Sequence, residues 1–254
     1  MVYDSARGCW RMLCAFRGLD ARYVLKSPAL LRTFLRDWRS FRKLGGSAPF
    51  SDIAPRLLDR FPNTQTGGGH YFYQDVWALR HLKRFQPPEH HDVGSRLDGF
   101  VAQATAICPV FYWDIRAPQF TLPDFHFRQG SVLDLPLASD SIRSLSCLHV
   151  AEHIGLGRYG DAIDPSGTEK ALRELQRVIA PGGQLLFAMP IGRERVEFNA
   201  QRIWNPDKPV RILDSMRLIE FKAIDDSGHF REAVQPLDFY DSEYACGLYC
   251  FVKS

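Results

Sequence analysis

Residues 172–190, LRELQRVIAPGGQLLFAMP, form the stretch that decides the fold. Apolar residues recur every three or four positions over Thr168–Ala180, which predicts an amphipathic helix. Residues 181–183, Pro-Gly-Gly, end this helix, and the apolar run Gln184–Pro190 predicts a buried strand directly after it. A helix that turns straight into a strand is the repeating unit of a parallel sheet with crossover helices.

The segments on either side of this unit alternate in the same way. A further helix is predicted over Asp98–Ile107. The other predicted strands are His90–Val93, Val110–Asp114, Phe125–Gln129, Arg143–Val150, Leu218–Asp225 and Glu243–Val252. Turn signals before the last strand favour an antiparallel edge position. The sequence therefore predicts an α/β protein with a mostly parallel seven-stranded sheet and an antiparallel edge strand.

Two further helices are predicted before the sheet. Ser27-Pro28 reads as a helix start, and apolar residues at helical spacing follow it as far as Gly45-Gly46. The second helix covers Tyr71–Phe85, with Phe72, Val76, Leu79 and Leu82 as its apolar stripe. We therefore expect an N-terminal helical extension at residues 1–86 and a main domain at residues 87–254.

Composition excludes several classes of protein. Apolar runs are too short for a membrane-spanning helix, and no secretory signal is visible, so we expect a cytoplasmic protein. The six cysteines form no CxxC pair, which argues against a zinc finger or a disulfide scaffold and favours reduced thiols.

Basic charge is concentrated at the N-terminal end. Residues 1–45 hold ten Lys and Arg against three Asp, a charge of +7 that leaves −4 for the rest of a chain of net charge +3. This leader favours peripheral contact with an anionic membrane or an acidic partner, or is simply the solvated face of helices. Nucleic-acid binding is not expected, because no basic-aromatic stripe follows the leader.

Acidic residues stand where two neighbouring strands are predicted to end. Asp92 ends the first strand, and Asp114 ends the second, 22 residues later. Ligands of open parallel sheets bind beyond these carboxyl ends, and an acid at the second strand is suited to hold both ribose hydroxyls. The alternative is that the two acids only cap turns or helices. A dinucleotide site fits less well, because Arg96 occupies the middle position of a G-x-G-x-x-G pattern.

The stretch from Asp92 to Pro190 resembles the core of the class I S-adenosylmethionine-dependent methyltransferases, especially in residues 172–183. The resemblance implies a Rossmann-like fold and S-adenosylmethionine as cofactor. Two segments, HVAEHIGLGRYGDAID at residues 149–164 and PIGRERVEFN at 190–199, are similar to an uncharacterised bacterial family that often accompanies glycan-assembly enzymes. The chain departs from the methyltransferase pattern where Arg96 and Asp98 replace glycines.

The resemblance implies a set of cofactor-binding residues around the strand ends. Asp92 is expected to face the ammonium group of the cofactor, while Gly94 and Ser95 keep the turn close to its methionine part. Asp114 and Ile115 are expected at the ribose, and Ser131 and Val132 at the adenine. His149, at the end of the fourth strand, is expected near the reacting methyl group.

The segment from His149 to Asp161 is too polar for a core connection and too long for a tight turn, as functional loops are. His149 or His153 is a candidate base for an acceptor hydroxyl, with Glu152 orienting or charging the site. A divalent-metal site made by these three residues is an alternative, although their spacing is not that of an H-E-x-x-H motif. A third reading is that the histidines only form hydrogen bonds at a helix end.

Further polar residues are candidates for an acceptor pocket. They are Arg158, Tyr159 and Asp161 in the same loop, Arg193 and Asn199 after the fifth strand, and His70 and Tyr71 as a lid. Together these features favour O-methylation of a sugar or glycan precursor. The alternative is a non-catalytic, methyltransferase-like scaffold or partner protein in glycan assembly. The oligomeric state does not follow from the sequence.

Overall fold

The computed structural model describes residues 27–50, 53 and 68–254. The chain divides into two units, Met1–Gly67 and Gly68–Ser254. The second unit contains the whole sheet and also the helix that the sequence analysis assigned to the extension at residues 1–86. The basic residues and the two cysteines before residue 27 lie outside the described residues.

The described part of the first unit is a helix with a glycine stop. Helix α3 spans Ser27–Lys43, as predicted, and the indole of Trp38 donates a hydrogen bond to the carbonyl of Ala48 at 2.9 Å. Gly45 adopts a φ of +92°, and a Cβ at Gly46 would lie 2.2 Å from the ring of Phe41. The two glycines therefore end the helix and let the chain fold back against it.

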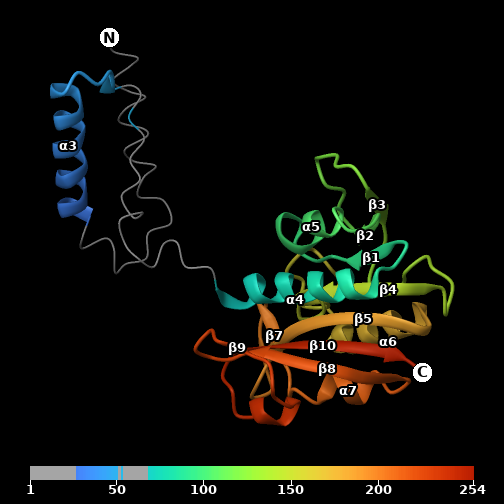
Figure 1. Ribbon diagram of the computed structural model, residues 1–254. Coiled ribbons are helices and arrows are strands. Elements are labelled where there is room, and N and C mark those ends of the chain that lie inside the picture. The colour runs from blue at the N-terminus through green and yellow to red at the C-terminus, as the bar shows by residue number, and fades with distance from the viewer. Residues whose placement is uncertain (1–26, 51–52, 54–67) are drawn as a thin grey trace. The chain divides into compact units, whose positions relative to one another are not determined.

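The second unit is built on one eight-stranded sheet of order β3-β2-β1-β4-β5-β10-β8-β9 (Figure 1). Its strands are β1 (His90–Val93), β2 (Val110–Asp114), β3 (Phe125–Gln129), β4 (Ile142–Leu148), β5 (Ile179–Ile191), β8 (Met216–Ile224), β9 (Phe230–Arg231) and β10 (Ala245–Lys253). All seven predicted strands are present. The sequence analysis missed β9 and a separate hairpin of β6 (Arg195–Glu197) and β7 (Gln201–Ile203).

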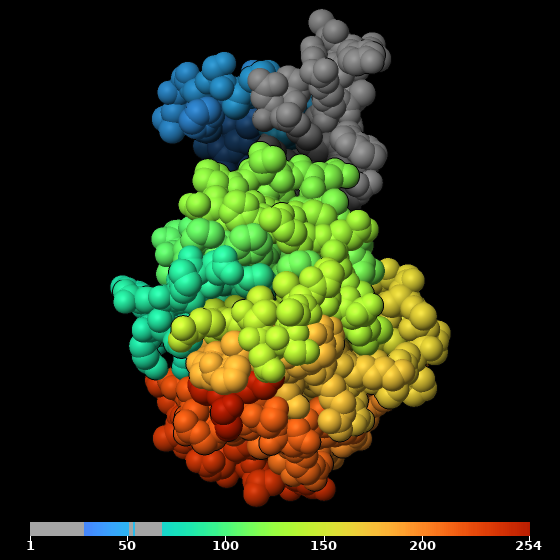
Figure 2. Space-filling view, turned by 90° about the vertical axis from the view of Figure 1, so that its right-hand side faces the viewer, coloured from blue at the N-terminus to red at the C-terminus, as the bar shows by residue number. Residues whose placement is uncertain are grey.

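The five strands from β3 to β5 pair in parallel, whereas β10 is antiparallel to both of its neighbours. β10 is inserted between β5 and β8, and the antiparallel strand at the margin is the two-residue β9. In Figure 2 the early strands, in green, lie at one end of this unit and the C-terminal strands, in red, at the other. The predicted fold class, an α/β protein with a mostly parallel sheet, is confirmed. The last predicted strand, β10, is antiparallel as expected but lies inside the sheet and not at its edge.

Helical segments cover both faces of the sheet (Figure 1). They are α4 (Gly69–Phe85), the π-helical turn η3 (Leu97–Val101), α5 (Ala102–Ala104), the 3₁₀ turn η4 (Ala151–His153), α6 (Gly167–Val178), α7 (Lys208–Ile212) and the 3₁₀ turn η5 (Pro236–Phe239). The single helix predicted over Asp98–Ile107 is thus shorter and irregular, because Gly99 leaves helical geometry inside it.

The stretch that decided the fold folds as predicted, with one shift. α6 ends at Val178, because Ile179 already pairs with Ile142 in the sheet. Gly182 has a φ of +72°, and a Cβ at Gly183 would lie within 2.9 Å of two backbone carbonyl oxygens. Both glycines lie inside β5, where its pairing with β4 is interrupted between Ile179 and Gln184, and glycine is required at both positions for the strand to take this course.

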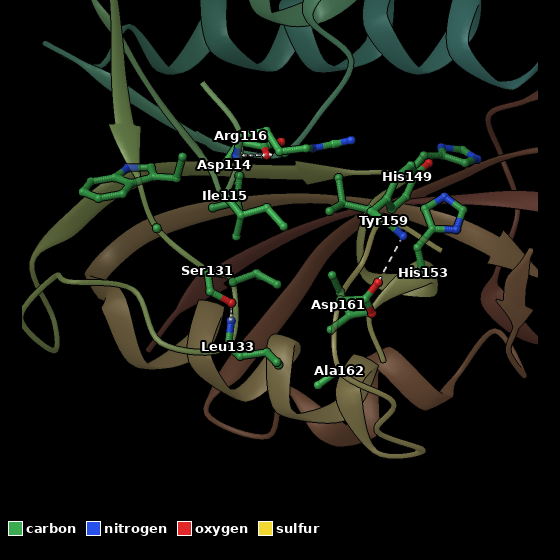
Figure 3. A pocket seen from close by; sticks show the side chains of 17 residues that line it. Asp114, Ile115, Arg116, Ser131, Leu133, His149, His153, Tyr159, Asp161 and Ala162 are labelled. Carbon is green, nitrogen blue, oxygen red and sulfur yellow. Dashed lines mark hydrogen bonds and ion pairs between the residues drawn. The ribbon is translucent and has the colours of Figure 1, made fainter. Parts of the chain in front are cut away.

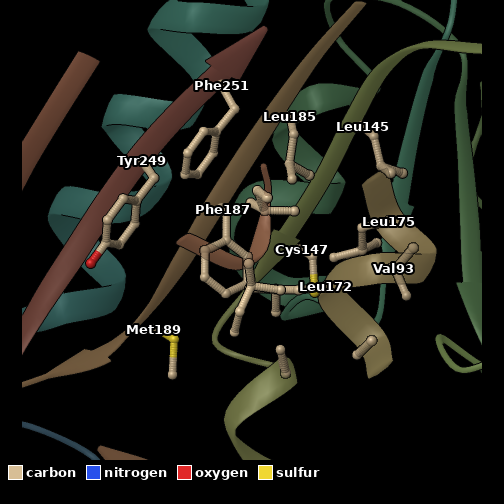
Figure 4. Close-up of a cluster of buried hydrophobic side chains, with 14 of the residues drawn as sticks. Val93, Leu145, Cys147, Leu172, Leu175, Leu185, Phe187, Met189, Tyr249 and Phe251 are labelled. Atoms are coloured by element: carbon tan, nitrogen blue, oxygen red, sulfur yellow. The ribbon is translucent and has the colours of Figure 1, made fainter. Parts of the chain in front are cut away.

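Alternate residues of the central strands face two separate apolar cores. Leu185 and Phe187 of β5 pack with α6 on one face, and Leu186 and Ala188 pack with α4 on the other. The first core contains Phe187 beside Tyr249, whose ring centroids lie 6.0 Å apart (Figure 4). Replacing one such buried aromatic side chain by alanine typically lowers the stability of a protein by about 3–5 kcal/mol. This core therefore stabilises the sheet that carries the site.

Helix α4 buries only half of the predicted stripe. Leu82 is buried and Leu79 packs against the core, as predicted, but Phe72 and Val76 are exposed. The buried face also includes Gln74, Asp75, Trp77 and His81, which the pattern of apolar residues did not reveal. Trp77 and His81 both contact one carboxylate oxygen of Glu220 on β8, at 2.8 Å and 2.7 Å.

Candidate functional site

A cavity of about 300 Å³ opens at the carboxyl ends of β1, β2 and β4, where the sequence placed the cofactor. One wall comes from the loops after β2 and β3, and the opposite wall comes from residues 149–162 (Figure 3). We call it the cofactor cavity. Its position beyond the strand ends is the one that ligands of open α/β sheets occupy.

Asp114 lies in the wall of this cavity with 13% of its side chain exposed. Its carboxylate accepts a hydrogen bond from the backbone N–H of Arg116 at 2.8 Å and another from the hydroxyl of Tyr112 at 3.1 Å. A carboxylate has about four acceptor positions, so two contacts leave capacity for a ligand. These contacts also fix the direction of the carboxylate before any ligand arrives.

Asp92 is completely buried and does not line the cavity. One of its carboxylate oxygens accepts the backbone N–H of Ser95 at 3.0 Å, and the other accepts the hydroxyl of Ser146 on β4. Burial raises the pKa of Asp92 to about 6, against the effect of these hydrogen bonds. Asp92 therefore has the capping role that the sequence also allowed and does not reach the cavity directly, while a contact with the cofactor ammonium through water stays a prediction.

Ser95 is also buried and outside the cavity, contrary to the prediction. Its hydroxyl oxygen accepts the backbone N–H of Leu148 at 3.0 Å, which ties the turn after β1 to the end of β4. Between these two buried residues, Gly94 does line the cavity with a φ of +68°. A Cβ there would lie 3.0 Å from Val150, so glycine keeps the turn close to the neighbouring loop.

The remaining predicted cofactor residues line the cavity together. Ile115 is 46% exposed, and Val132, a buried residue of the loop after β3, adds apolar surface to the cavity. The Ser131 hydroxyl oxygen accepts the backbone N–H of Leu133 at 3.2 Å, so this loop is held in one shape. Apolar side chains with a few fixed polar groups are typical of cavities for small ligands.

A second cavity, also of about 300 Å³, adjoins the first, and we call it the acceptor chamber. The two cavities share Gly94, His149, His153 and Tyr159. The chamber is otherwise lined by Tyr71, Arg96, Leu148, Glu152, Arg158, Gln201 and Tyr244. Most of these side chains are polar or aromatic, so the chamber suits a hydrophilic molecule better than an apolar one.

His149 stands at the junction of the two cavities in a left-handed backbone conformation, with a φ of +55°. Its Nδ1 is hydrogen-bonded to the amide oxygen of Gln74 on α4, which assigns the proton to Nδ1. Its Nε2 is buried without a hydrogen-bond partner among the described residues. Burial, together with His70 and His153, lowers the pKa of His149 to about 3, so the ring is neutral.

His153 and Glu152 form a second polar pair on the turn η4. Nδ1 of His153 lies 2.7 Å from the carbonyl oxygen of Ala200, which leaves Nε2 as an acceptor 3.6 Å from the carboxyl group of Glu152. Both oxygens of Glu152 are buried and without hydrogen-bond partners in the described chain. Burial lowers the pKa of His153 and raises the pKa of Glu152 to about 8.

The loop after η4 is held in shape by hydrogen bonds to the side chain of Asp161, which lies within the loop. Asp161 accepts backbone N–H groups of Gly155 at 2.6 Å, Gly157 at 3.3 Å and Tyr159 at 3.2 Å. Burial alone would raise the pKa of Asp161, but these hydrogen bonds outweigh it and lower the pKa. Although Asp161 borders the cofactor cavity, its carboxylate serves to shape the loop.

Tyr159, which this loop presents, stands between two guanidinium groups. Arg116 lies 4.9 Å and Arg158 lies 5.2 Å from the centre of its ring, within the range of cation–π contacts. Arg158 also donates to the carbonyl of Ala200 at 2.9 Å. The two predicted residues, Arg158 and Tyr159, thus lie at the chamber as expected.

Three other predicted substrate residues do not line either cavity. Arg193 forms an exposed ion pair with Glu243 at 2.8 Å, and Asn199 is exposed at the tip of the β6–β7 hairpin. His70 packs between Tyr244 and His149, with ring centroids 5.1 Å and 5.5 Å away. The hairpin contributes through the backbone carbonyl of Ala200 instead, which no side-chain pattern could reveal.

Several residues of the site were missed by sequence reasoning. Arg96 ion-pairs with exposed Asp98 and lies 5.4 Å from the ring of Tyr71, at the chamber and away from the cofactor cavity. Gln201 of β7 and Tyr244, just before β10, share a 3.2 Å hydrogen bond although they are distant in the sequence. Buried Arg202 binds the carbonyl of Asp164 at 3.0 Å and so clamps the loop. No local signal singles these residues out.

Solved structures with the same architecture support the assignment of the fold. The [4+2]-cyclase SpnF matches with a TM-score of 0.53 and 12% identity, covering 74% of this chain and 85% of its own. A candidate methyltransferase from Bacillus halodurans C-125 has a TM-score of 0.50 and 12% identity, with 70% and 98% covered. This chain has the Rossmann-like class I methyltransferase fold. A candidate sarcosine dimethylglycine methyltransferase from Galdieria sulphuraria is similar as well, with a TM-score of 0.50 and 14% identity, covering 71% of this chain and 84% of its own.

Sequence comparison adds a match to a family without an assigned activity. Residues 133–238 match the model described as a Caenorhabditis protein of unknown function, DUF268. The match spans both segments that suggested an uncharacterised family, although its description names Caenorhabditis, not bacteria, and no glycan. No curated protein matches the chain. None of the helices in the described ranges is long and apolar enough to span a membrane.

Proposed function

We propose that this protein is an S-adenosylmethionine-dependent methyltransferase that methylates a hydroxyl group of a sugar or glycan precursor. The observation that carries the proposal is the pair of adjoining cavities, each of about 300 Å³, that share Gly94, His149, His153 and Tyr159. Transfer between two bound molecules requires two such sites side by side, because proximity and alignment supply much of the rate.

The residues of the cofactor cavity fit an adenosyl ligand. Asp114 offers a fixed carboxylate to the ribose hydroxyls, and Ile115 and Val132 offer apolar surface to the adenine. Gly94 leaves the turn after β1 open toward the acceptor chamber. S-adenosylmethionine supplies a methyl group on a sulfonium that is a good leaving centre. Arg96, which replaces a glycine of the usual motif, does not reach into this cavity.

The acceptor chamber supports a polar, hydroxyl-rich acceptor. Arg96, Arg158 and Gln201 offer hydrogen-bond donors, and Tyr71 and Tyr244 offer aromatic faces. Aromatic and amide groups suit a sugar ring, and guanidinium groups suit a phosphate or carboxylate attached to it. An apolar acceptor would make no use of these polar groups.

His153 is the base in this proposal. Its Nε2 carries no proton, because Nδ1 donates to the carbonyl of Ala200 and burial keeps the ring neutral by lowering its pKa. Nε2 would take the proton of the acceptor hydroxyl as that oxygen receives the methyl group, which bound S-adenosylmethionine would supply from its sulfonium. The carboxyl group of Glu152 lies 3.6 Å away and would orient the imidazole, since burial raises the pKa of this acid to about 8 and keeps it uncharged near neutral pH.

Calorimetric titration with S-adenosylhomocysteine tests the cofactor half of the proposal. We expect micromolar affinity, and we expect Asp114→Asn to weaken it by about 10-fold or more, because a hydrogen bond to a charged group is worth about 1.5–3 kcal/mol. Asp134→Asn is the matched control, since Asp134 is exposed on the neighbouring loop outside the cavity. Absence of binding, or equal losses in both variants, would contradict the proposal.

The part of the proposal that concerns the acceptor is tested by measuring turnover. Release of S-adenosylhomocysteine is measured with hexoses, sugar phosphates and nucleotide sugars as acceptors, and the product is identified by a mass increase of one methylene group. A protein that binds the cofactor but methylates none of these would favour another acceptor class. A protein that binds no cofactor would favour the non-catalytic scaffold.

A further inference from the structure

Three metal-ligating side chains from distant parts of the chain meet beside the acceptor chamber. His70 lies at the start of α4, His149 follows β4, and Cys246 lies on β10. Each offers one ligand atom, and the three atoms lie within 4.8 Å of one another. The transfer proposed above uses His153 as its base and assigns no chemistry to His70 or Cys246.

His149 is oriented as a metal ligand would be. Its Nδ1 is hydrogen-bonded to the side-chain oxygen of Gln74, and Gln74 is itself buried and donates to Asp75 at 3.2 Å. Metal-bound histidines commonly donate their other ring N–H to an oxygen in this way, which fixes the tautomer. The remaining nitrogen, Nε2, is buried without a hydrogen-bond partner in the described chain.

The other two ligands are also in suitable positions. Cys246 is fully buried, and its sulfur makes a 3.8 Å contact with the carbonyl of Gly247, which is too long for a strong hydrogen bond. His70 is half-buried and held by Tyr244, whose ring stacks on it at 5.1 Å between centroids. Each ligand therefore stands on a packed element with little freedom to move away.

We propose that His70, His149 and Cys246 bind one zinc ion. Two imidazoles and a thiolate form a ligand set that favours Zn²⁺ over Mg²⁺ or Ca²⁺, which prefer oxygen ligands. Ligand atoms on a tetrahedral zinc ion are about 3.3–3.8 Å apart, given bonds of about 2.0–2.3 Å. The three ligand atoms, all within 4.8 Å of one another, would have to approach one another slightly to reach this spacing.

The ion would leave one position free, as in catalytic zinc sites. His149 lines both cavities, so the free position lies at the wall where an acceptor oxygen would bind. This role rests on the proposed methyl transfer, whereas the zinc site itself does not. The metal site considered from sequence contained His149 but paired it with Glu152 and His153. Tertiary structure supplies the partners from α4 and β10 instead.

Cobalt spectroscopy on the full-length protein, purified with a chelator, tests the site. One equivalent of Co²⁺ should give intense visible bands of a four-coordinate ion and a near-ultraviolet band from the thiolate. Cys246→Ser should abolish the thiolate band, and Cys108→Ser, a buried free cysteine elsewhere, should retain it. Loss of a residue that only orients a ligand, such as Gln74, typically weakens metal binding by about 10- to 100-fold. His70→Ala removes a ligand itself, at a half-buried position, and should therefore weaken zinc binding by more than this.

Folding of each variant is checked by circular dichroism, and His70→Ala decides the matter where Cys246→Ser does not fold. Failure to bind one equivalent of Co²⁺ or Zn²⁺, or an unchanged thiolate band in Cys246→Ser, would overturn the site. Titration of the same samples with S-adenosylhomocysteine separates the two proposals. Cofactor binding without zinc contradicts the zinc site alone, and zinc binding without cofactor contradicts the methyltransferase proposal alone.

Discussion

Two buried pairs of an acid and a histidine stand at neighbouring strands of the same sheet and differ in how they are satisfied. In β1, Nδ1 and Nε2 of His90 each lie 2.8 Å from a serine hydroxyl of β4, and Asp92 accepts two hydrogen bonds. After β4, Glu152 and Nε2 of His149 are equally hidden but have no hydrogen-bond partners in the described chain. The same residue types are thus hydrogen-bonded within the protein in one place and left without partners among the described residues in the other.

The pKa values follow this difference. Burial raises the pKa of Asp92 to about 6, where hydrogen bonds from Ser146 and Ser95 oppose the shift. Burial raises the pKa of Glu152 to about 8, where no side chain donates a hydrogen bond. Unsatisfied buried groups cost stability, so a folded protein retains them chiefly where function requires them.

The largest effect is expected beside the unsatisfied pair, at His153, which lies 3.6 Å from Glu152 and is the base in the proposed function. We expect His153→Ala to reduce methyl transfer by about 100-fold or more, because a positioned base contributes about 10²–10⁴. Binding of S-adenosylhomocysteine should change little. Turnover with an identified acceptor and calorimetric titration measure the two quantities. His229→Ala is the control, since His229 is exposed outside both cavities. Full turnover in His153→Ala would remove His153 from the chemistry.

The satisfied pair should respond in stability. We expect Asp92→Ala to lower the free energy of unfolding by about 2–3 kcal/mol, because it leaves the Ser95 N–H buried without its acceptor and removes one of the two partners of the Ser146 hydroxyl, which keeps only His90. Denaturant unfolding measures this loss. Asp98→Ala removes an exposed carboxylate paired with Arg96 and should change stability far less. Equal losses in the two variants would mean that the network around Asp92 stabilises nothing.

Replacing Glu152 should raise stability, whereas replacing Asp92 should lower it. Its unfolded-state pKa is near 4.5 and its folded-state pKa is raised to about 8, so its stabilising contribution is complete below pH 4.5 and is lost as pH rises toward 8. Glu152→Gln removes this loss and should gain on the order of 1–2 kcal/mol at pH 8 and little at pH 5. Thermal melts at both pH values, with chelator present, measure the difference. A variant less stable than the parent at pH 8 would contradict the prediction.

The smallest effect is expected at the position that departs most from the methyltransferase pattern. Arg96 lies at the acceptor chamber, so Arg96→Gly should change the affinity for S-adenosylhomocysteine by no more than about twofold, the size of a lost surface contact. Calorimetric titration tests this directly. A large gain in affinity would show instead that the arginine obstructs the cofactor.

Most of the sheet followed from local pattern. Strands such as Val110–Asp114 and the unit around residues 172–190 are apolar runs bounded by turn residues, and burial on both faces enforces that pattern. The stripe on α4 was only half right, because Phe72 and Val76 are exposed while the polar residues Gln74 and Asp75 are buried, with Gln74 hydrogen-bonded to His149 after β4. The β6–β7 hairpin was missed because strands of three residues carry too little periodicity.

The site residues likewise fall into those that the sequence placed correctly and those that it did not. Asp114, Ile115, Ser131 and Val132 line the cofactor cavity as expected, because strand ends in a parallel sheet lie at one edge whatever else the chain does. Asp92 and Ser95 lie beside it but are turned into the protein. Position along the chain fixes which strand end a residue occupies, and only packing fixes where its side chain points.

The sequence alone therefore determined the order of elements, the fold class and the edge of the sheet that holds the site, because these depend on periodicity and turn chemistry within a few residues. Tertiary structure alone decided which buried polar groups are satisfied and which remain open. It also brought together His70, His149 and Cys246. Hydrogen-bond partners and metal ligands come from distant segments, and their meeting depends on the packing of the whole unit, which no local pattern records.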